Sequence, residues 1–254
     1  HDTLRKLLPT DGSVRMVANT EQWGVLVLAG PRSRDVLAKL TRTPLDNASF
    51  PWLSGKQISV GRATAHALRV NFVGELGWEL HHPIEQQNAI FDAVMEAGAE
   101  FGIKPFGIRA MTTMAIEKSY RLIPRELSIE YNAYESGLDR FIKPEKGDFI
   151  GRDGVVKAKE NGLKWNFVTL EVHGVTDSDA RGNEPIYATD GTLIGRATHG
   201  SFGFRTGKSL ALAMVKPDYS SEGTEVEIGI LGAKHKATVI AESPYDAENT
   251  ALRA

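Results

Sequence analysis

The chain has 254 residues, of which 41% are hydrophobic and 24% are charged, a balance typical of a globular protein with a sizeable core. Its net charge of -2 gives no general attraction to nucleic acid. Because it contains no cysteine, disulfides, thiolate metal sites and thiol catalysis are excluded. No apolar run approaches the roughly 18 residues of a membrane span, and the first residues have no apolar signal region. We expect a cytoplasmic protein without a membrane or nucleic-acid partner and, since it begins with His1, part of a longer polypeptide.

The first half of the chain predicts a sheet with packed helices. A continuous apolar run at 23–30 is typical of a strand covered on both faces, and Pro31 suits the start of a short helix. The order of predicted elements is strand, helix, three strands and helix, which indicates an α+β fold. The remaining expected strands lie at 57–61, at 67–73 and from Trp78 onward, and amphipathic helices are expected at 86–101 and 108–118.

The second half changes to short segments with a period of two residues. A mixed-charge stretch at 142–162 predicts a connector, which we place at 151–164, with one short helix at 153–159. Six short strands with regular turns then indicate a small barrel or a sandwich. We therefore expect an α+β domain over 1–150, the connector, and a β domain over 165–254. The six strands are expected at 167–172, 184–188, 193–198, 209–215, 225–231 and 236–241.

Several familiar motifs are missing. Gly207-Lys208-Ser209 resembles the end of a phosphate-binding loop, but Phe202 occupies the position of the required first glycine. His81 and His82 are adjacent on a predicted strand and therefore point to opposite faces, so no metal site is expected there. Neither a Gly-x-Ser-x-Gly elbow nor a His-Glu-x-x-His pair occurs.

Two carboxylates stand out in the stretch 71–80, NFVGELGWEL. Trp78 and Leu80 share one face of the predicted strand, so Glu79 points to the other face. One interpretation is that Glu75 and Glu79 are ordinary exposed carboxylates. The other is a carboxylate that accepts two parallel hydrogen bonds from a flat donor edge, with Trp78 as a pocket wall. Spacing alone leaves both interpretations open.

Four sequence motifs together resemble those of a known family. The resemblance runs from about residue 23 to the end of the chain, with the motifs in the family's order. It identifies the folate-binding aminomethyltransferases of the glycine-cleavage T-protein family, in the form fused to dimethylglycine and sarcosine dehydrogenases. The motifs are VGELGWEL at 73–80, GIRAMTTMAIEKSY at 107–120, NAYESGL at 132–138 and THGSFGFRTGKSLAL at 198–212.

The resemblance implies a fold and a set of binding residues. It implies a folate-binding α+β domain with ferredoxin-like parts, followed by a small carboxy-terminal β-barrel. Glu79 would hydrogen-bond the amino and ring N–H groups of a pterin, with Glu75 as a second candidate. Beside Trp78, Tyr120 and Tyr134 would be further pocket walls or, as the alternative, ordinary core aromatics.

Two features depart from the family pattern. Ala115 stands where family members often have an arginine. The family's catalytic aspartate lies in an amino-terminal segment outside this sequence, so no catalytic residue is assigned.

The implied function is one-carbon transfer that depends on tetrahydrofolate, as the T-protein-like portion of an amine-demethylating system. Folate N5 would attack an aminomethyl or iminium carbon, forming 5,10-methylenetetrahydrofolate and releasing an amine. The donor would be a small N-methyl amine or a related compound, and FAD would take part only if an upstream oxidoreductase domain exists. Two alternatives stay open: a folate-dependent demethylase of a sulfonium or methoxy compound, and a folate-binding or assembly module without chemistry of its own.

Overall fold

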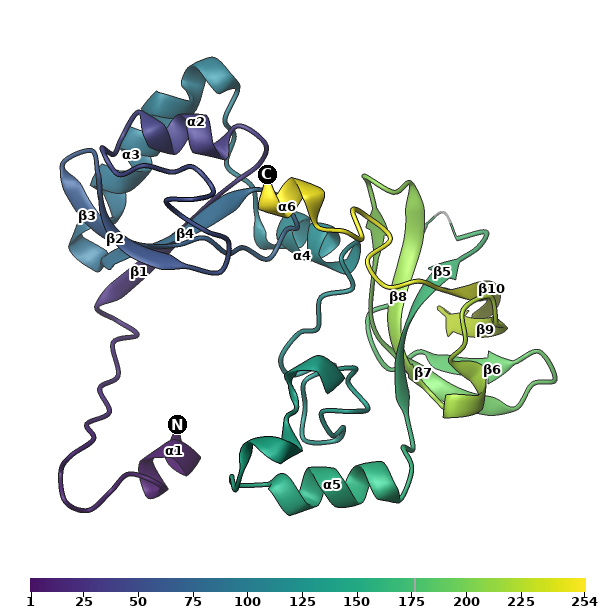
Figure 1. The fold of residues 1–254 in the computed structure, drawn as a ribbon. Helices are drawn as coiled ribbons and strands as arrows, with labels where there is room; N and C mark the ends of the chain where they lie inside the picture. The colour runs from purple at the N-terminus through teal and green to yellow at the C-terminus, as the bar shows by residue number, and fades with distance from the viewer. Residues whose placement is uncertain (176) are drawn as a thin grey trace. The chain divides into compact units, whose positions relative to one another are not determined.

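The computed structural model describes residues 1–175 and 177–254 (Figure 1). The chain divides into two compact units, and the segment 105–164, which we expected to close the first domain and form the connector, groups with the barrel. Among the described residues, no helix is long and apolar enough to cross a membrane. Unit 1 comprises His1–Asn71, Glu75–Lys104 and Arg253–Ala254, and unit 2 comprises Phe72–Gly74 and Pro105–Leu252.

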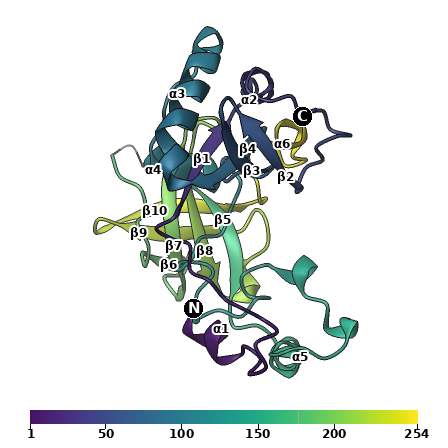
Figure 2. The ribbon, with the colours of Figure 1, turned by 90° about the vertical axis from the view of Figure 1, so that its left-hand side faces the viewer.

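Unit 1 is built on a four-stranded antiparallel sheet with the order β1-β4-β3-β2. The apolar sides of two helices pack with one face of this sheet to form the core of the unit (Figures 1 and 2). The predicted succession of strand, helix, three strands and helix is confirmed. The elements are α1 (Asp2–Lys6), β1 (Trp23–Ala29), α2 (Ser33–Ala38), β2 (Gly55–Val60), β3 (Ala63–Leu68), β4 (Gly77–Pro83) and α3 (Gln87–Gly98).

Two expectations for this sheet were wrong. The third strand ends at Leu68 instead of continuing to residue 73, and its inward face consists of three small side chains, Ala63, Ala65 and Ala67. The first strand lies at the edge of the sheet, and Val25 is 47% exposed, so the strand is not covered on both faces. An apolar run does not distinguish an edge strand from a central one, because strand order depends on contacts between distant segments.

Unit 2 contains a closed six-stranded barrel with the order β10-β5-β8-β7-β6-β9 (Figure 1). All six predicted strands are present, and the barrel is closed because β10 pairs with both β5 and β9. The α+β fold with a carboxy-terminal barrel is therefore confirmed. The strands are β5 (Asn166–Val172), β6 (Pro185–Ala188), β7 (Leu193–Gly203), β8 (Lys208–Val215), β9 (Glu225–Ile230) and β10 (Ala233–Ile240).

Strand β8 is buried on both faces. Its alternate residues Ala211, Ala213 and Val215 belong to the apolar interior of the barrel. The residues between them pack outward against a second cluster that includes Ile116 and Tyr131. The segment before the barrel therefore covers part of its outer surface. The helices of this segment are α4 (Ile108–Ile116) and α5 (Arg152–Glu160), and α6 (Thr250–Arg253) follows the barrel.

Candidate functional site

Glu79 lies on the face of the unit 1 sheet that is opposite the core. Trp78 and Leu80 are fully buried, whereas the side chain of Glu79 is 28% exposed. Its Oε2 atom lies 3.0 Å from Nε2 of His81, which faces the same side. Within residues 1–175 and 177–254, its Oε1 atom has no hydrogen-bond partner. The carboxylate therefore keeps acceptor capacity for a ligand.

The neighbours of Glu79 in the sheet are apolar. Antiparallel pairing places Glu79 between Val27 of β1 and Leu68 of β3. Directly paired residues share a face, so the carboxylate has an aliphatic side chain on each side. Such an environment lowers the competition from water and strengthens hydrogen bonds to the carboxylate.

The backbone explains why glycine stands at both glycine positions of the Gly-Glu-x-Gly-x-Glu motif. Gly74 has a φ of +73°, which favours glycine. At Gly77, an added Cβ atom would lie 2.6 Å from the carbonyl oxygen of Leu28, so a side chain would push β4 away from β1. The two glycines thus allow the chain to turn into β4 and to pair closely with β1, with Glu79 on the face away from the core.

The other two residues predicted from this motif are Trp78 and Glu75, and both have contacts that stabilise the fold. Trp78 is fully buried, and its ring stands edge-on to Phe50 with 6.2 Å between centroids. In unit 1 it therefore fills the core beneath the strand and does not form an exposed wall. Glu75 lies in the irregular segment before β4, where its carbonyl oxygen accepts a hydrogen bond from Asn71 Nδ2 at 2.6 Å.

Tyr120 belongs to unit 2 and follows α4. Its ring lies 5.1 Å from that of Phe72, and the two form a tilted aromatic pair. Burial raises the pKa of the Tyr120 hydroxyl; Arg205 and Arg140 oppose this effect and Asp246 adds to it. The phenol therefore stays protonated near neutral pH and is available as a hydrogen-bond donor.

Tyr134 is also part of unit 2 and is only 6% exposed. The Asn132 side chain accepts hydrogen bonds from the backbone N–H groups of Tyr134 and Glu135, both at 3.0 Å. The ammonium group of Lys159 lies 5.4 Å from the centroid of the Tyr134 ring. The predicted residues thus belong to two units, with Glu75, Trp78 and Glu79 in unit 1 and the tyrosines in unit 2.

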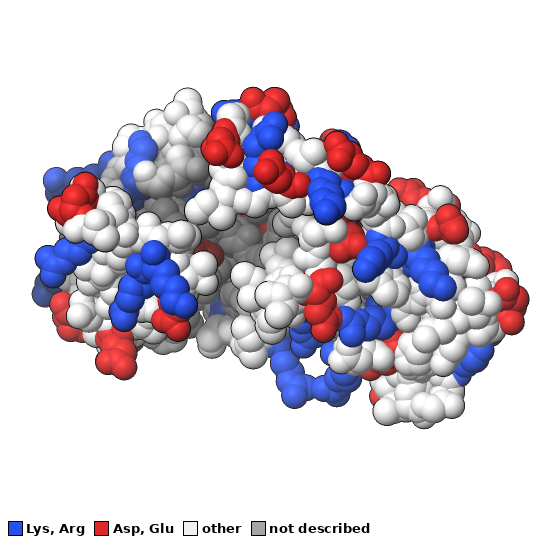
Figure 3. Space-filling model, turned by 90° about the horizontal axis from the view of Figure 1, so that it is seen from below, with Lys and Arg blue, Asp and Glu red and all other residues white. Residues whose placement is uncertain are grey.

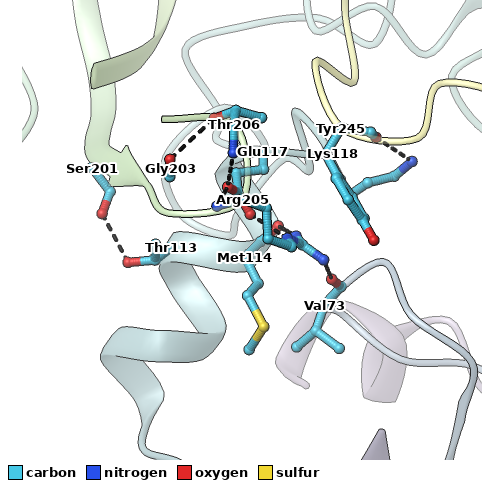
Figure 4. Close-up of polar contacts among 10 residues, drawn as sticks. All are labelled: Val73, Thr113, Met114, Glu117, Lys118, Ser201, Gly203, Arg205, Thr206 and Tyr245. Carbon is cyan, nitrogen blue, oxygen red and sulfur yellow. Dashed lines mark hydrogen bonds and ion pairs between the residues drawn. The ribbon is translucent and has the colours of Figure 1, made fainter. Parts of the chain in front are cut away.

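A buried ion pair between Glu117 and Arg205 holds the turn between β7 and β8 (Figure 4). Glu117 follows α4, and its side chain is 1% exposed. Its carboxylate accepts hydrogen bonds from Arg205 Nε at 2.5 Å and from the backbone N–H groups of Arg205 and Thr206 at 2.7 and 3.1 Å. The turn between β7 and β8 is thereby fixed to the end of α4.

Arg205 also makes contacts beyond this ion pair. It donates hydrogen bonds to the carbonyl oxygens of Val73 at 3.0 Å and Met114 at 2.8 Å. Its guanidinium carbon lies 3.8 Å from the ring centroid of Tyr245 (Figure 4). This arrangement was not predicted, although Glu117 and Arg205 both stand within the family motifs, because they are 88 residues apart in the sequence.

A second buried polar group lies on β7. The Nδ1 atom of His199 accepts a hydrogen bond from Arg125, and the histidine is 6% exposed. Burial, with a smaller effect of Arg125, lowers the pKa of His199 to about 4. Next to it, the hydroxyl of Thr198 donates to the fully buried carboxylate of Glu126. His199 is therefore neutral across the physiological pH range.

The described residues offer no cluster of three or more histidine, aspartate or glutamate side chains that could hold a metal ion. His82 is fully buried on the core face of β4, whereas His81 is partly exposed on the other face, as strand parity predicts. Acidic and basic side chains are interspersed on the molecular face shown in Figure 3. Binding of an anion therefore depends on local groups.

Family models match both parts of the chain. The GCVT N-terminal domain matches residues 1–146, and the glycine cleavage T-protein C-terminal barrel domain matches residues 166–246. The motif-based resemblance is therefore confirmed.

The curated relatives are named either as dehydrogenases or as aminomethyltransferases. Human mitochondrial dimethylglycine dehydrogenase is 40% identical over 88% of this chain, and the match covers 26% of that protein. Mouse mitochondrial sarcosine dehydrogenase is 30% identical over 94% of this chain and 27% of its own length. Aminomethyltransferase from Thermoanaerobacter pseudethanolicus is 31% identical over 87% of this chain and 59% of its own length. The chain thus spans about a quarter of the two dehydrogenases and about 60% of the aminomethyltransferase.

A solved structure supports the fold. The crystal structure of glycine cleavage system aminomethyltransferase T from Bartonella henselae superposes with a TM-score of 0.78 and 21% identity. The superposition covers 89% of this chain and 60% of that one. The two family models, which together match most of the sequence, show that the chain belongs to the glycine-cleavage T-protein family.

Proposed function

We propose that this chain binds tetrahydrofolate and takes part in the transfer of a one-carbon unit, as the T-protein-like portion of an amine-demethylating system. The observation that carries the proposal is the carboxylate of Glu79. It is partly exposed on the outward face of β4 and has an oxygen atom without a partner in the described part of the chain. A pterin presents an amino group and a ring N–H group along one edge, and a carboxylate matches this edge with two parallel hydrogen bonds.

Supporting roles follow from the environment of each predicted residue. Glu75 and the two motif glycines shape the entry to β4, and Trp78 supports the strand from the core. Tyr120 and Phe72 offer an aromatic surface to a flat ring, with the Tyr120 hydroxyl as a donor. From its buried position, Tyr134 supports the segment that comes after it in the chain.

The contribution of these residues to the reaction would be binding and orientation. When bound, tetrahydrofolate would supply the nitrogen nucleophile that accepts an aminomethyl or iminium carbon as the amine leaves. Glu79 would fix the rotation of the pterin in its plane, and such positioning lowers the entropic part of the activation barrier. No described residue is assigned as the proton-transfer group.

The nature of the one-carbon donor is a separate part of the proposal. Relatives named dimethylglycine and sarcosine dehydrogenase favour a small N-methyl amine, with a flavin oxidoreductase as a fused or associated partner. FAD would belong to that partner. A sulfonium or methoxy donor is the alternative within the same fold. A folate-binding or assembly module without chemistry is the alternative from another class.

Calorimetry with tetrahydrofolate tests the binding step. We expect saturable binding to the protein and a loss of affinity of about tenfold or more in Glu79→Gln, because the neutral amide replaces an acceptor oxygen by a donor. Glu85→Gln is the matched control, since Glu85 is exposed in the same unit. Absence of binding to the unaltered protein, or equal affinity of both variants, would overturn the role of Glu79.

Product analysis separates the catalyst from the simple binder. Methylenetetrahydrofolate formation would be measured with secondary and tertiary N-methyl amines on this chain and on the longest polypeptide that contains it. Folate binding without product from either polypeptide would favour the binding module. Product from a sulfonium or methoxy donor alone would favour the demethylase.

A further inference from the structure

A pocket of about 590 Å³ lies on the outer surface of the barrel in unit 2. Its lining comes from β7, from the ends of β6 and β8, and from the segments around residues 130 and 165. The size falls in the usual range for small-molecule sites, roughly 300 to 1,000 Å³. None of the residues proposed for folate binding contributes to its lining.

The walls of the pocket are largely apolar. Met214 is fully buried, and Trp165 is partly exposed. Leu193 is 56% exposed at the start of β7. A flat ring therefore has an indole and an aliphatic side chain to pack against.

Strand register brings the basic groups of the pocket together. Arg196 pairs with Met214 across β7 and β8, so both face the outside of the barrel. Lys216 is two residues beyond Met214, and its backbone N–H donates to the carbonyl oxygen of Ile194 at 2.9 Å. Arg196 and Lys216 both line the pocket.

The charged side chains that line the pocket do not balance to zero. Arg196 forms an ion pair with Glu130, the one acidic side chain of the lining. The ammonium group of Lys216 has no partner in residues 1–175 or 177–254. The lining thus carries one unbalanced positive charge, which a singly charged anion would neutralise.

Tyr131 adds a neutral donor. Its side chain is 9% exposed, and its hydroxyl oxygen accepts a hydrogen bond from Arg196 Nε at 2.8 Å. Burial raises the pKa of this hydroxyl, and Glu126 and Glu135 raise it further, so the proton is retained. That proton is donated to no other group in the described part of the chain.

We propose that this pocket binds a flat, apolar monocarboxylate, such as an aromatic acid, with its carboxylate held by Lys216, Arg196 and the Tyr131 hydroxyl and its ring against Trp165 and Leu193. The site is separate from the proposed folate site and does not depend on it. Its ligand would act as an effector or auxiliary substrate of the barrel unit.

Indole N–H signals in ¹⁵N-tryptophan-labelled protein provide the test. The chain has four tryptophans, and Trp165→Phe identifies the signal of interest. Benzoate and 2-naphthoate are the probes, with benzamide and benzylamine as neutral and cationic analogues. We expect a saturable shift of the Trp165 signal with the acids, and about tenfold weaker responses with benzamide and benzylamine.

Variants link the response to the pocket. Lys216→Gln should weaken acid binding about tenfold, and Leu193→Gln, a neutral change of similar size, should also weaken it because the ring loses an apolar contact. Lys236→Gln, an exposed lysine on β10, should change nothing. Unchanged spectra of the remaining tryptophans show that each variant is folded.

Three outcomes would overturn the inference: no shift of Trp165 at millimolar acid, an equal response to benzamide, or unchanged affinity in Lys216→Gln. Tetrahydrofolate is added in a separate titration. If it shifts the Trp165 signal and competes with benzoate, the pocket belongs to the folate site and the inference of a separate site fails. Failure of folate binding by itself leaves the benzoate result unaffected.

Discussion

At the scale of single residues, orientation on β4 separates the roles of neighbouring side chains. Trp78 is fully buried and Glu79 is 28% exposed, although they are adjacent. The difference arises from the two-residue period of a strand. A one-residue shift in register would bury the carboxylate and expose the indole, so Gly74 before β4 and Gly77 at its first position matter for the site.

His199 provides a pH-dependent test at this scale. Its pKa of about 4 lies below the ordinary value of 6.5, so below about pH 6.5 the unfolded chain binds a proton that the folded chain excludes. Stability should therefore fall as the pH falls from 6.5 toward 4, by at most about 3 kcal/mol from this group. Above pH 6.5 the group contributes no pH dependence.

The measurement is urea unfolding at pH 7.5 and pH 4.5, followed by circular dichroism, on the unaltered protein and His199→Gln. The loss of free energy of unfolding between the two pH values should be smaller in the variant. The other titrating groups are common to both proteins and cancel in the comparison. Equal losses would show that His199 is protonated in the folded state as readily as in the unfolded one.

At the scale of elements, the buried pair of Glu117 and Arg205 joins the end of α4 to the turn between β7 and β8. Replacing Arg205 by methionine leaves the Glu117 carboxylate buried without its cation. Such a loss costs about 3 to 5 kcal/mol. We expect Arg205→Met to lower the free energy of unfolding by this amount, as measured by urea denaturation.

The half-exposed pair of Lys208 and Glu171 is the control for this prediction. Lys208→Met should cost less than about 1 kcal/mol, because solvent screens an exposed pair. A double-mutant cycle with Glu117→Gln then measures the coupling between Glu117 and Arg205. Additive effects of the two substitutions would contradict a direct stabilising interaction.

At the scale of the whole molecule, charge is distributed without a dominant sign. The net charge is -2, and acidic and basic groups are both spread over the face in Figure 3. Attraction of an anionic folate therefore depends on groups near the site and not on a long-range field.

Salt dependence measures this property. Between 50 and 500 mM NaCl, the Kd for tetrahydrofolate from calorimetry should change by less than about threefold, since short contacts in a partly desolvated site are weakly screened. Heparin serves as a non-specific polyanion and should not bind. A steep loss of folate affinity with salt would indicate a broad basic surface in place of a local site.

Much of the fold follows from local sequence pattern. The six barrel strands were predicted because alternation and turn residues act over a few positions. The opposite orientations of Trp78 and Glu79 follow from strand parity alone. Motifs spread over four segments also predicted the family, because they contain residue types that the local backbone requires, such as glycine at the positive φ of Gly74.

Only the tertiary structure decided the features that depend on distant segments. It showed that β1 is an edge strand and that β3 ends at Leu68. It also joined Glu117 to Arg205, and Tyr131 to Arg196 beside a pocket. Local periodicity determines which face of an element is buried, whereas pairing across 65 or 88 residues depends on the path of the whole chain. The spacing of residues in a single sequence does not reveal that path.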